Sequence, residues 1–250
     1  MTYVLIPGAG GDPRYWDLLV DELHTRGHRA VAVPLPAADP DAALPEYAAT
    51  VRAVVDTHPE VVLVAQSLGA FTAPLVADHP AVRLLVLVNP MIPAPGETPG
   101  DWWAATSHAQ ARAAYAAAQG RAPNADVDPA VDFFHDVPAD VAARMHDGPQ
   151  ESDAVFVRPN PLRDWPHVPT RVISGRDDRF FPADFQRRLA ADRLGVHPDE
   201  LPGGHLLALS RPHLLAEKLQ SFTAGQKRKS GRGIRRAPML PGPSRPVGRE

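Results

Sequence analysis

The sequence predicts an α/β protein with a mostly parallel, twisted sheet that is flanked by helices on both faces. Short apolar segments of strand length alternate with segments of helical periodicity along most of the chain, an order that is typical of a parallel sheet. A chain of 250 residues can bury a large core in one such domain. No internal repeat is visible, so we expect a single domain of this class.

The elements of the first part of the chain follow one another in the expected order. Residues 3–6 are an apolar strand that runs into a glycine-rich turn. The helix over residues 12–26 has Asp12 as its N-cap and Pro13 at its first helical position. We then expect strands over 28–33, 61–65 and 82–88. Two further helices are expected, one over 44–57 and one from the turn after residue 66 to about residue 77.

This alternation stops after the strand that ends near Asn89. From Met91 to about Pro166 there is no convincing strand, and we expect an alanine-rich helix over 101–119 and a short helix over 138–146. The sheet then resumes at Thr170, and further elements are expected over 183–194 (helix), before His205 (strand) and over 211–222 (helix). These patterns predict a core over residues 1–90 and 167–223, with a helical cap over 91–166 inserted between its two parts.

Residues 224–250 differ in composition from the rest of the chain. They hold eight of the 26 Lys and Arg residues but only one of the 29 Asp and Glu residues, and they show no apolar periodicity. A basic segment that is rich in Pro and Gly is expected to be a disordered tail. Such a tail could contact nucleic acid, but an extension without a fold is the simpler interpretation, and we expect no nucleic-acid partner.

The composition also excludes several kinds of site. Cysteine is absent, which removes disulfides, a thiol nucleophile and thiolate metal ligands. The histidines are scattered without a metal-binding spacing, so we expect no metal, and no motif calls for a cofactor. The apolar run at the start lacks the basic region of a signal peptide, and no stretch approaches the roughly 18 apolar residues that span a membrane. We therefore expect a cytoplasmic protein without membrane contact.

The most informative motif surrounds Ser67. Five apolar residues, 61–65, form a buried strand, and the segment that follows Ser67 reads as a helix. A serine at the tight turn between them has small residues at the flanking positions, Ala65 and Gly69. This pattern resembles the nucleophile elbow of the α/β-hydrolases, which presents a serine hydroxyl at the top of the sheet. Ala65 departs from the usual glycine and implies a more crowded turn.

Two later motifs match the other members of a catalytic triad in the order that these hydrolases use. The strand at Thr170 leads into a G-x-x-D-x-x-x-P loop, in which Asp178 matches the position of the acid and Asp177 is the alternative. His205 follows two glycines shortly before the last helix, where the family keeps its general base. A loop histidine without a role is the other interpretation of His205, but the order of the three motifs argues against it.

The glycine-rich turn after the first strand has two interpretations. Residues 7–11 read Pro-Gly-Ala-Gly-Gly, and in the resemblance this turn supplies an oxyanion-hole amide. The match implies the backbone N–H groups of Ala9 and Leu68 as the donors. Pro7 stands where the family usually has histidine, which leaves open how the turn is braced. A phosphate-binding loop is the competing interpretation, but the Lys-Ser/Thr of a Walker motif and the third glycine of a dinucleotide motif are missing.

The resemblance covers about residues 1–222 and implies the α/β-hydrolase fold. The pattern is most similar to the small capped hydrolases that include plant methylesterases and hydroxynitrile lyases, and to uncharacterised bacterial relatives. It implies a carboxylesterase-like serine hydrolase that cleaves a small ester, thioester or lactone through an acyl-enzyme. An amide fits the same triad. The cap would then supply most of the substrate pocket, with the candidates Met91, Trp102, Trp103, Phe133 and Phe134.

Each of these cap residues also has a structural interpretation. The aromatic residues and Met91 can pack the cap onto the sheet instead of contacting a substrate. His108 and His135 lie in the same region and can make a polar contact with a substrate, although an exposed or structurally hydrogen-bonded histidine is the more common situation. We expect the partner of this site to be a small-molecule substrate.

Two other functions fit the same fold. A hydroxynitrile lyase of the plant type would have a lysine beside the catalytic histidine, whereas Leu206 follows His205 and the folded region holds only Lys218. A small-molecule binding protein with slow or absent turnover is the second alternative, and the intact set of triad residues argues against it. Epoxide hydrolases and haloalkane dehalogenases of this fold use aspartate at the elbow, so Ser67 argues against both.

Overall fold

The computed structural model describes residues 1–145 and 147–230. The chain divides into two compact units, Met1–Ala216 and Glu217–Glu250, and the first unit contains the whole sheet. The predicted tail begins inside helix α11, which spans Pro212–Ser230 and so continues past the predicted end at residue 222. Residues 231–250 of that predicted tail lie outside the described residues.

The sheet has six strands in the order β2-β1-β3-β4-β5-β6, and every neighbouring pair is parallel. Its carboxyl-terminal ends therefore all lie at one edge. The order reverses between β1 and β3, where side chains from the ends of both strands can line a common crevice. The strands span Thr2–Ile6 (β1), Arg29–Ala32 (β2), Val61–Gln66 (β3), Val82–Val88 (β4), Thr170–Gly175 (β5) and Asp199–Leu201 (β6).

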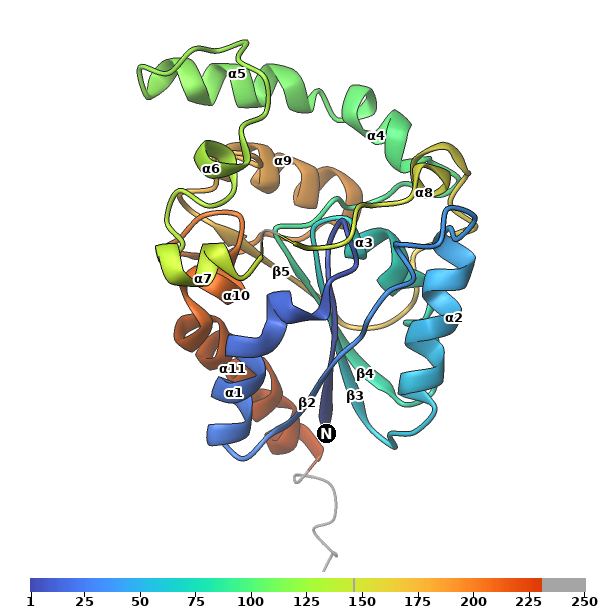
Figure 1. Cartoon of the computed structure of the whole chain (residues 1–250). Helices are drawn as coiled ribbons and strands as arrows, with labels where there is room; N and C mark the ends of the chain where they lie inside the picture. The colour runs from blue at the N-terminus through green and yellow to red at the C-terminus, as the bar shows by residue number, and fades with distance from the viewer. Residues whose placement is uncertain (146, 231–250) are drawn as a thin grey trace, which may run out of the picture. The chain divides into compact units, whose positions relative to one another are not determined.

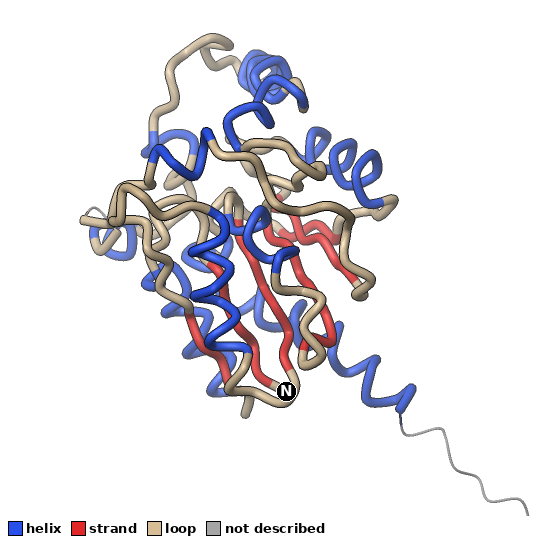
Figure 2. The backbone as a smooth tube through the Cα atoms, turned by 90° about the vertical axis from the view of Figure 1, so that its right-hand side faces the viewer, coloured by secondary structure: helices blue, strands red, loops and turns tan. Residues whose placement is uncertain are grey.

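Helices lie on both faces of the sheet, as predicted (Figures 1 and 2). Helix α1 packs beside α10 on one face, whereas α2 packs beside α3 on the other. The predicted N-cap of the first helix is present, because the Asp12 side chain accepts a hydrogen bond from the N–H of Arg14. The core helices span Pro13–Trp16 (η1), Asp17–Thr25 (α1), Leu44–Val55 (α2), Gly69–Thr72 (α3), Ala73–Leu75 (η2), Ala183–Leu194 (α9) and Leu207–Ser210 (α10).

The region between β4 and β5 contains only helices and loops among its described residues, and it lies over the carboxyl-terminal ends of the strands (Figure 1). The helix predicted over 101–119 is two helices, because Ser107 adopts a left-handed conformation (φ 56°) that interrupts the helical hydrogen bonds. The predicted helix at 138–146 is shorter, and His146 lies outside the described residues. The cap helices span Pro99–Ala105 (α4), His108–Ala118 (α5), Pro129–Asp132 (α6), Ala139–Ala143 (α7) and Asp153–Val157 (α8).

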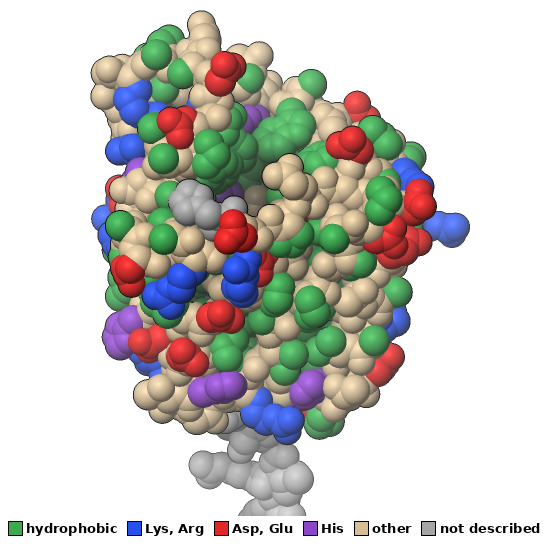
Figure 3. Space-filling model, in the orientation of Figure 1, with side chains coloured by type: hydrophobic (Ala, Val, Ile, Leu, Met, Phe, Trp, Pro, Cys, Tyr) green, Lys and Arg blue, Asp and Glu red, His purple; other side chains and the backbone are tan. Residues whose placement is uncertain are grey.

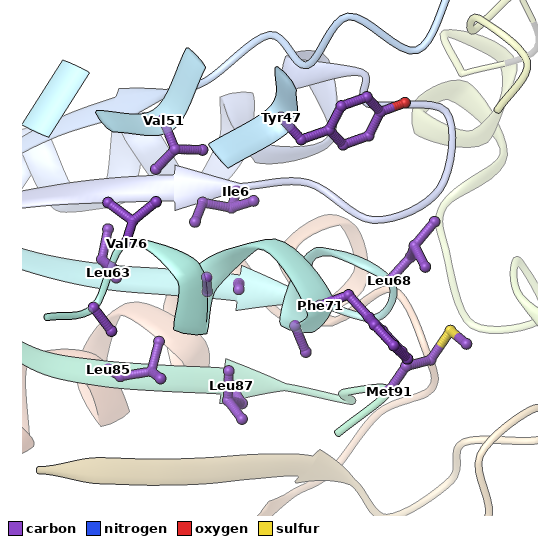
Figure 4. Packing of buried hydrophobic residues seen from close by; sticks show 14 of the residues in the cluster. Ile6, Tyr47, Val51, Leu63, Leu68, Phe71, Val76, Leu85, Leu87 and Met91 are labelled. Carbon is purple, nitrogen blue, oxygen red and sulfur yellow. The ribbon is translucent and has the colours of Figure 1, made fainter. Parts of the chain in front are cut away.

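The core lies between the sheet and the helices that cover it. All six residues of β3 are buried, which explains why this strand reads as a continuous apolar run rather than an alternating one. Figure 4 shows side chains of β3 and β4 packed with those of α2 and α3, and Met91 beside Phe71. Each large apolar side chain buried here contributes about 1.5–3 kcal/mol. Over the described ranges no helix combines the length and apolarity that crossing a membrane requires.

Candidate active site

Ser67 occupies the turn between β3 and α3. Its backbone is left-handed (φ 50°), a conformation that costs a non-glycine residue about 1–2 kcal/mol. Backbone hydrogen bonds hold the turn: the Ser67 N–H donates to the Val88 carbonyl (3.1 Å), and the Ser67 carbonyl accepts from the Met91 N–H (3.0 Å). A Cβ at Gly69 would lie 2.5 Å from the Pro7 carbonyl oxygen, so this position requires glycine.

Asp178 and His205 form a buried pair. The distance from His205 Nδ1 to Asp178 Oδ2 is 2.8 Å, and both side chains are almost completely excluded from solvent. The other oxygen of Asp178, Oδ1, accepts hydrogen bonds from the N–H groups of Phe180 (2.8 Å) and Phe181 (2.7 Å). Because the carboxylate is held as an acceptor, it favours the imidazole tautomer that carries hydrogen on Nδ1 and leaves Nε2 as an acceptor.

Asp177, the alternative acid, is exposed and holds a different loop. Its Oδ2 accepts from the N–H of Gly203 (3.0 Å), and its own N–H donates to the Gly203 carbonyl (2.9 Å). These contacts fix the position of the loop that carries His205. The structure therefore brings Asp178, and not Asp177, to the imidazole ring.

Asn89 joins the strands and loops of this site, although the sequence predicts no role for it beyond ending a strand. It follows β4, which lies between the strands that precede Ser67 and Asp178. Its side chain is fully buried: Nδ2 donates to the carbonyls of Gly204 (3.1 Å) and His205 (2.8 Å), and Oδ1 accepts from the Gly175 N–H (2.6 Å). The signal in the sequence is an asparagine that ends a strand before a proline, since asparagine tolerates the observed φ of 43°.

Ser67 and His205 line the same cavity, which has a volume of about 370 Å³. The cavity lies where the carboxyl ends of the strands meet the cap, and its walls include the glycine-rich turn after β1. Hydrophobic side chains gather around a hollow on the corresponding face of the molecule (Figure 3). The larger apolar side chains that line the cavity include Phe133, Phe134, Met145, Leu206 and Leu209.

The two amides predicted as oxyanion donors differ from their neighbours in their hydrogen bonds. Within the described part of the chain, the N–H groups of Ala9 and Leu68 have no protein acceptor. By contrast, the Gly10 N–H donates to Glu151 Oε2 (2.9 Å), and the Gly11 N–H donates to the Gly8 carbonyl (3.1 Å). Ala9 lines the cavity, and Leu68 directly follows Ser67 at the elbow.

The predicted substrate contacts separate into two groups. Phe133 and Phe134 line the cavity, and the ring centroid of Phe133 lies 5.3 Å from that of His205. Met91 and Trp102 do not line it, because both are buried in the core, where Trp102 Nε1 donates to the Ile92 carbonyl (2.9 Å). Trp103 also does not line it: this side chain borders a second cavity together with His108 and Phe180.

The cap histidines have structural environments. His108 Nε2 donates to the Phe180 carbonyl (2.7 Å), and burial lowers the pKa of this imidazole. His135 is half-buried and does not line the cavity, and burial lowers the pKa of this side chain too.

Several cavity residues were not predicted from the sequence. Tyr15 is buried in η1, and its hydroxyl accepts a hydrogen bond from the Ala208 N–H (3.4 Å). Burial raises the pKa of Tyr15, so the phenol keeps its proton and can donate it to a ligand. Met145 lies in the turn after α7, near the end of the short helix predicted over 138–146, and Gln150 lies in a loop of the cap for which no element is predicted. The one signal in the sequence is position: Tyr15 lies shortly after the predicted glycine-rich turn at 7–11, and Gln66 directly precedes the predicted turn at Ser67.

Comparisons with known proteins agree with this architecture. A sequence model of the alpha/beta hydrolase family matches residues 3–218. A pyrethroid hydrolase from Sphingobium faniae JZ-2 superposes with a TM-score of 0.69 at 23% identity, over 91% of this chain and 99% of its own. Polyneuridine aldehyde esterase superposes with a TM-score of 0.72 at 17% sequence identity, over 89% of this chain and 98% of its own. A methylesterase from Arabidopsis superposes with a TM-score of 0.69 at 16% identity, over 90% of this chain and 99% of its own. Comparison with curated proteins gave no match.

Proposed function

Because the chain belongs to the alpha/beta hydrolase family and has its fold, we propose that it is a serine hydrolase of small esters, thioesters or lactones. The observation that carries this proposal is the buried hydrogen bond between His205 and Asp178 at the edge of a cavity that also contains Ser67. A serine on a strained turn, a histidine and an orienting carboxylate are the three groups that acyl transfer requires.

The proposed reaction has two halves. Ser67 Oγ attacks the carbonyl carbon of the ester while its proton moves to His205 Nε2, and Asp178 stabilises the resulting imidazolium. The same proton then passes from His205 to the leaving alkoxide, and an acyl-enzyme remains on Ser67. Water, deprotonated by His205, attacks this acyl group, and the second tetrahedral intermediate collapses to release the carboxylic acid and the free serine.

Negative charge develops on the carbonyl oxygen in both halves. The N–H groups of Ala9 and Leu68 are the proposed donors to this oxyanion, since neither has a protein acceptor among the described residues. A preformed donor of this kind typically contributes about 2.7–4 kcal/mol to the stability of the transition state.

The size and lining of the cavity support a small, largely apolar substrate. A volume of about 370 Å³ is near the lower end of the range for ligand pockets. Its apolar walls come mainly from Phe133, Phe134 and Met145. An uncharged carboxylester with short or medium chains therefore fits better than a highly anionic substrate, and the esterases among the similar structures are consistent with this.

A series of p-nitrophenyl esters, from acetate to decanoate, tests the proposal. We expect hydrolysis by the wild-type protein, a preference for one range of chain lengths, and loss of activity in Ser67→Ala. A folded wild-type protein that hydrolyses none of these esters, or a Ser67→Ala variant that keeps full activity, would contradict the proposal. The first result would favour a specialised thioesterase, a lyase or a binding role on the same fold.

A further inference from the structure

Glu151 connects the cap to the glycine-rich turn of the core. This residue lies in the loop between α7 and α8, far along the chain from the turn. Its Oε2 accepts a hydrogen bond from the Gly10 N–H (2.9 Å), and its Oε1 accepts one from the Ser152 N–H (3.1 Å). The residue is partly buried, and this burial raises the pKa of its carboxyl group.

Tyr47 is the second group that holds Glu151. Its hydroxyl donates a hydrogen bond to Glu151 Oε1, and burial, together with the neighbouring carboxylate, raises the pKa of the phenol, which therefore remains a donor. Figure 4 shows the ring of Tyr47 above the core on α2, with its hydroxyl directed away from the labelled core residues and toward the cap. The carboxylate of Glu151 thus bridges an element of the core and the turn after β1.

The backbone of the cap loop also lies against this turn. Gly10 is left-handed (φ 85°), and a Cβ added to it would lie 2.6 Å from the Pro149 carbonyl oxygen. Ser152 Oγ donates to the Pro40 carbonyl (3.0 Å), which anchors the same loop to the segment before α2. The contact is therefore built from several groups and does not depend on one exposed side chain.

We propose that Glu151 is a positioning residue that holds the glycine-rich turn in the conformation needed for the oxyanion hole. Ala9 lies between Gly8 and Gly10. The Gly10 N–H is fixed by Glu151, and the Gly8 carbonyl is fixed by the Gly11 N–H. Fixing both neighbours sets the direction of the Ala9 N–H, which is left without a protein acceptor in the described structure.

This role rests on the proposed function, since it assumes that Ala9 donates to an oxyanion. It also provides the brace that the sequence left open when Pro7 replaced the usual histidine. The brace comes from the cap, so the oxyanion turn has its active conformation only while the cap loop at 149–152 is seated.

The test compares Glu151→Ala and Glu151→Gln with Glu46→Gln. Glu46 is a matched control, because it is an acidic residue next to Tyr47 that caps α2 by accepting from the Ala43 N–H and does not touch the turn. For each variant, kcat and KM are measured with the preferred p-nitrophenyl ester. The inhibition constant is measured with a trifluoromethyl ketone of the same chain length, which forms a tetrahedral adduct with an oxyanion.

We expect Glu151→Ala to lower kcat about tenfold to a hundredfold, less than the loss that follows removal of an oxyanion donor. Binding of the trifluoromethyl ketone should weaken by a similar factor, while KM stays within about twofold, because the ground-state carbonyl depends little on this donor. Glu151→Gln keeps one acceptor for the Gly10 N–H and should lie between Glu151→Ala and the wild type. Glu46→Gln should match the wild type.

Three outcomes overturn the role of Glu151. In the first, kcat is unchanged in both variants; in the second, KM rises without a loss of inhibitor affinity, which indicates a purely structural contact. In the third, Glu151→Gln is faster than the wild type, which means that the charge of the carboxylate opposes the oxyanion.

If Glu151→Ala does not fold, the same kinetic and inhibitor measurements are made on Glu151→Gln and Tyr47→Phe. An inactive wild type refutes the proposed function, and this role with it, whereas an active wild type with unaffected variants refutes only the role of Glu151.

Discussion

Asn89 and His205 are joined by a 2.8 Å hydrogen bond from the Asn89 side-chain amide to the His205 carbonyl oxygen. The same amide donates to the Gly204 carbonyl, and its oxygen accepts from the Gly175 N–H at the end of β5. One buried side chain therefore fixes the backbone of the histidine loop and the strand that leads to Asp178. Neither loop could move relative to the other without leaving a buried polar group unpaired.

The first prediction concerns Asn89→Asp, which preserves size and the left-handed backbone. At neutral pH a carboxylate oxygen would face the two carbonyl oxygens, so we expect the free energy of unfolding to fall by roughly 3 kcal/mol, from the loss of two buried hydrogen bonds. The loss should be smaller at pH 5, because a protonated carboxyl group can donate one hydrogen bond. Urea unfolding at the two pH values measures both effects, and an equally stable variant at neutral pH would show that Asn89 is not a structural bridge.

The second prediction separates the two neighbouring aspartates. In Asp178→Asn the new NH₂ group has two possible orientations. It either faces His205 Nδ1 and favours the wrong tautomer, or it faces the N–H groups of Phe180 and Phe181, which now donate to Oδ1 and would lose their acceptor. We expect kcat for the preferred ester to fall about a thousandfold or more, as in other triads. Asp177→Asn should retain kcat within a few fold, because its amide oxygen can still accept the hydrogen bond from the Gly203 N–H and the side chain does not face the imidazole. Equal losses in the two variants would contradict the assignment of Asp178.

Much of the core fold could be predicted because its strands are buried on both faces. A buried parallel strand reads as an almost continuous apolar run. The run over 82–88, interrupted only by the exposed Arg83, has the observed bounds of β4. Helix α9 also begins and ends where the pattern predicts, after a proline and at a left-handed glycine, Gly195. Motifs with fixed spacing placed Ser67, Asp178 and His205 in one region of the structure for the same reason: each follows the carboxyl end of a parallel strand.

The cap was predicted less well because tertiary contacts determine its details. The alanine-rich segment has helical propensity throughout, and nothing local indicates the left-handed turn at Ser107. Trp102 and Trp103 are adjacent in sequence, yet one is buried in the core and the other borders a cavity. The roles of Asn89 and Glu151 depend on partners distant in sequence, and a single sequence gives no indication of such pairs.

The third prediction distinguishes a cap residue that lines the cavity of Ser67 from a cap residue that packs in the core. Phe133→Ala should raise KM for apolar esters about tenfold, because the side chain lines the serine cavity and the change corresponds to about 1.4 kcal/mol of lost contact. Trp102→Phe should leave KM unchanged but lower the free energy of unfolding by about 2 kcal/mol. The variant loses one buried hydrogen bond to the Ile92 carbonyl, which keeps Arg193 Nη1 as a donor, and it loses part of a fully buried ring. Steady-state kinetics and urea unfolding of both variants check this, and a higher KM in Trp102→Phe alone would reverse the assignment.

The last prediction uses the lowered pKa of His108. Burial holds the pKa of this imidazole below its ordinary value of 6.5, so the folded protein binds fewer protons here than the unfolded chain does. Stability is therefore lost as the pH falls below 6.5, until the folded pKa is reached. His108→Gln removes this titration while its amide can still donate to the Phe180 carbonyl.

At pH 7.5 we expect the wild type to be more stable than His108→Gln, because the imidazole packs among Trp103, Phe180 and Phe181. Between pH 7.5 and 5.5 the wild type should lose up to about 1.4 kcal/mol of unfolding free energy relative to the variant. Almost all of this loss falls in the one pH unit below 6.5, and about 1.4 kcal/mol is the limit for one group over one pH unit. Other titrating groups are common to both proteins and cancel in the difference between their free energies of unfolding. A difference that stays constant over this pH range would mean that His108 titrates equally in the folded and unfolded chains.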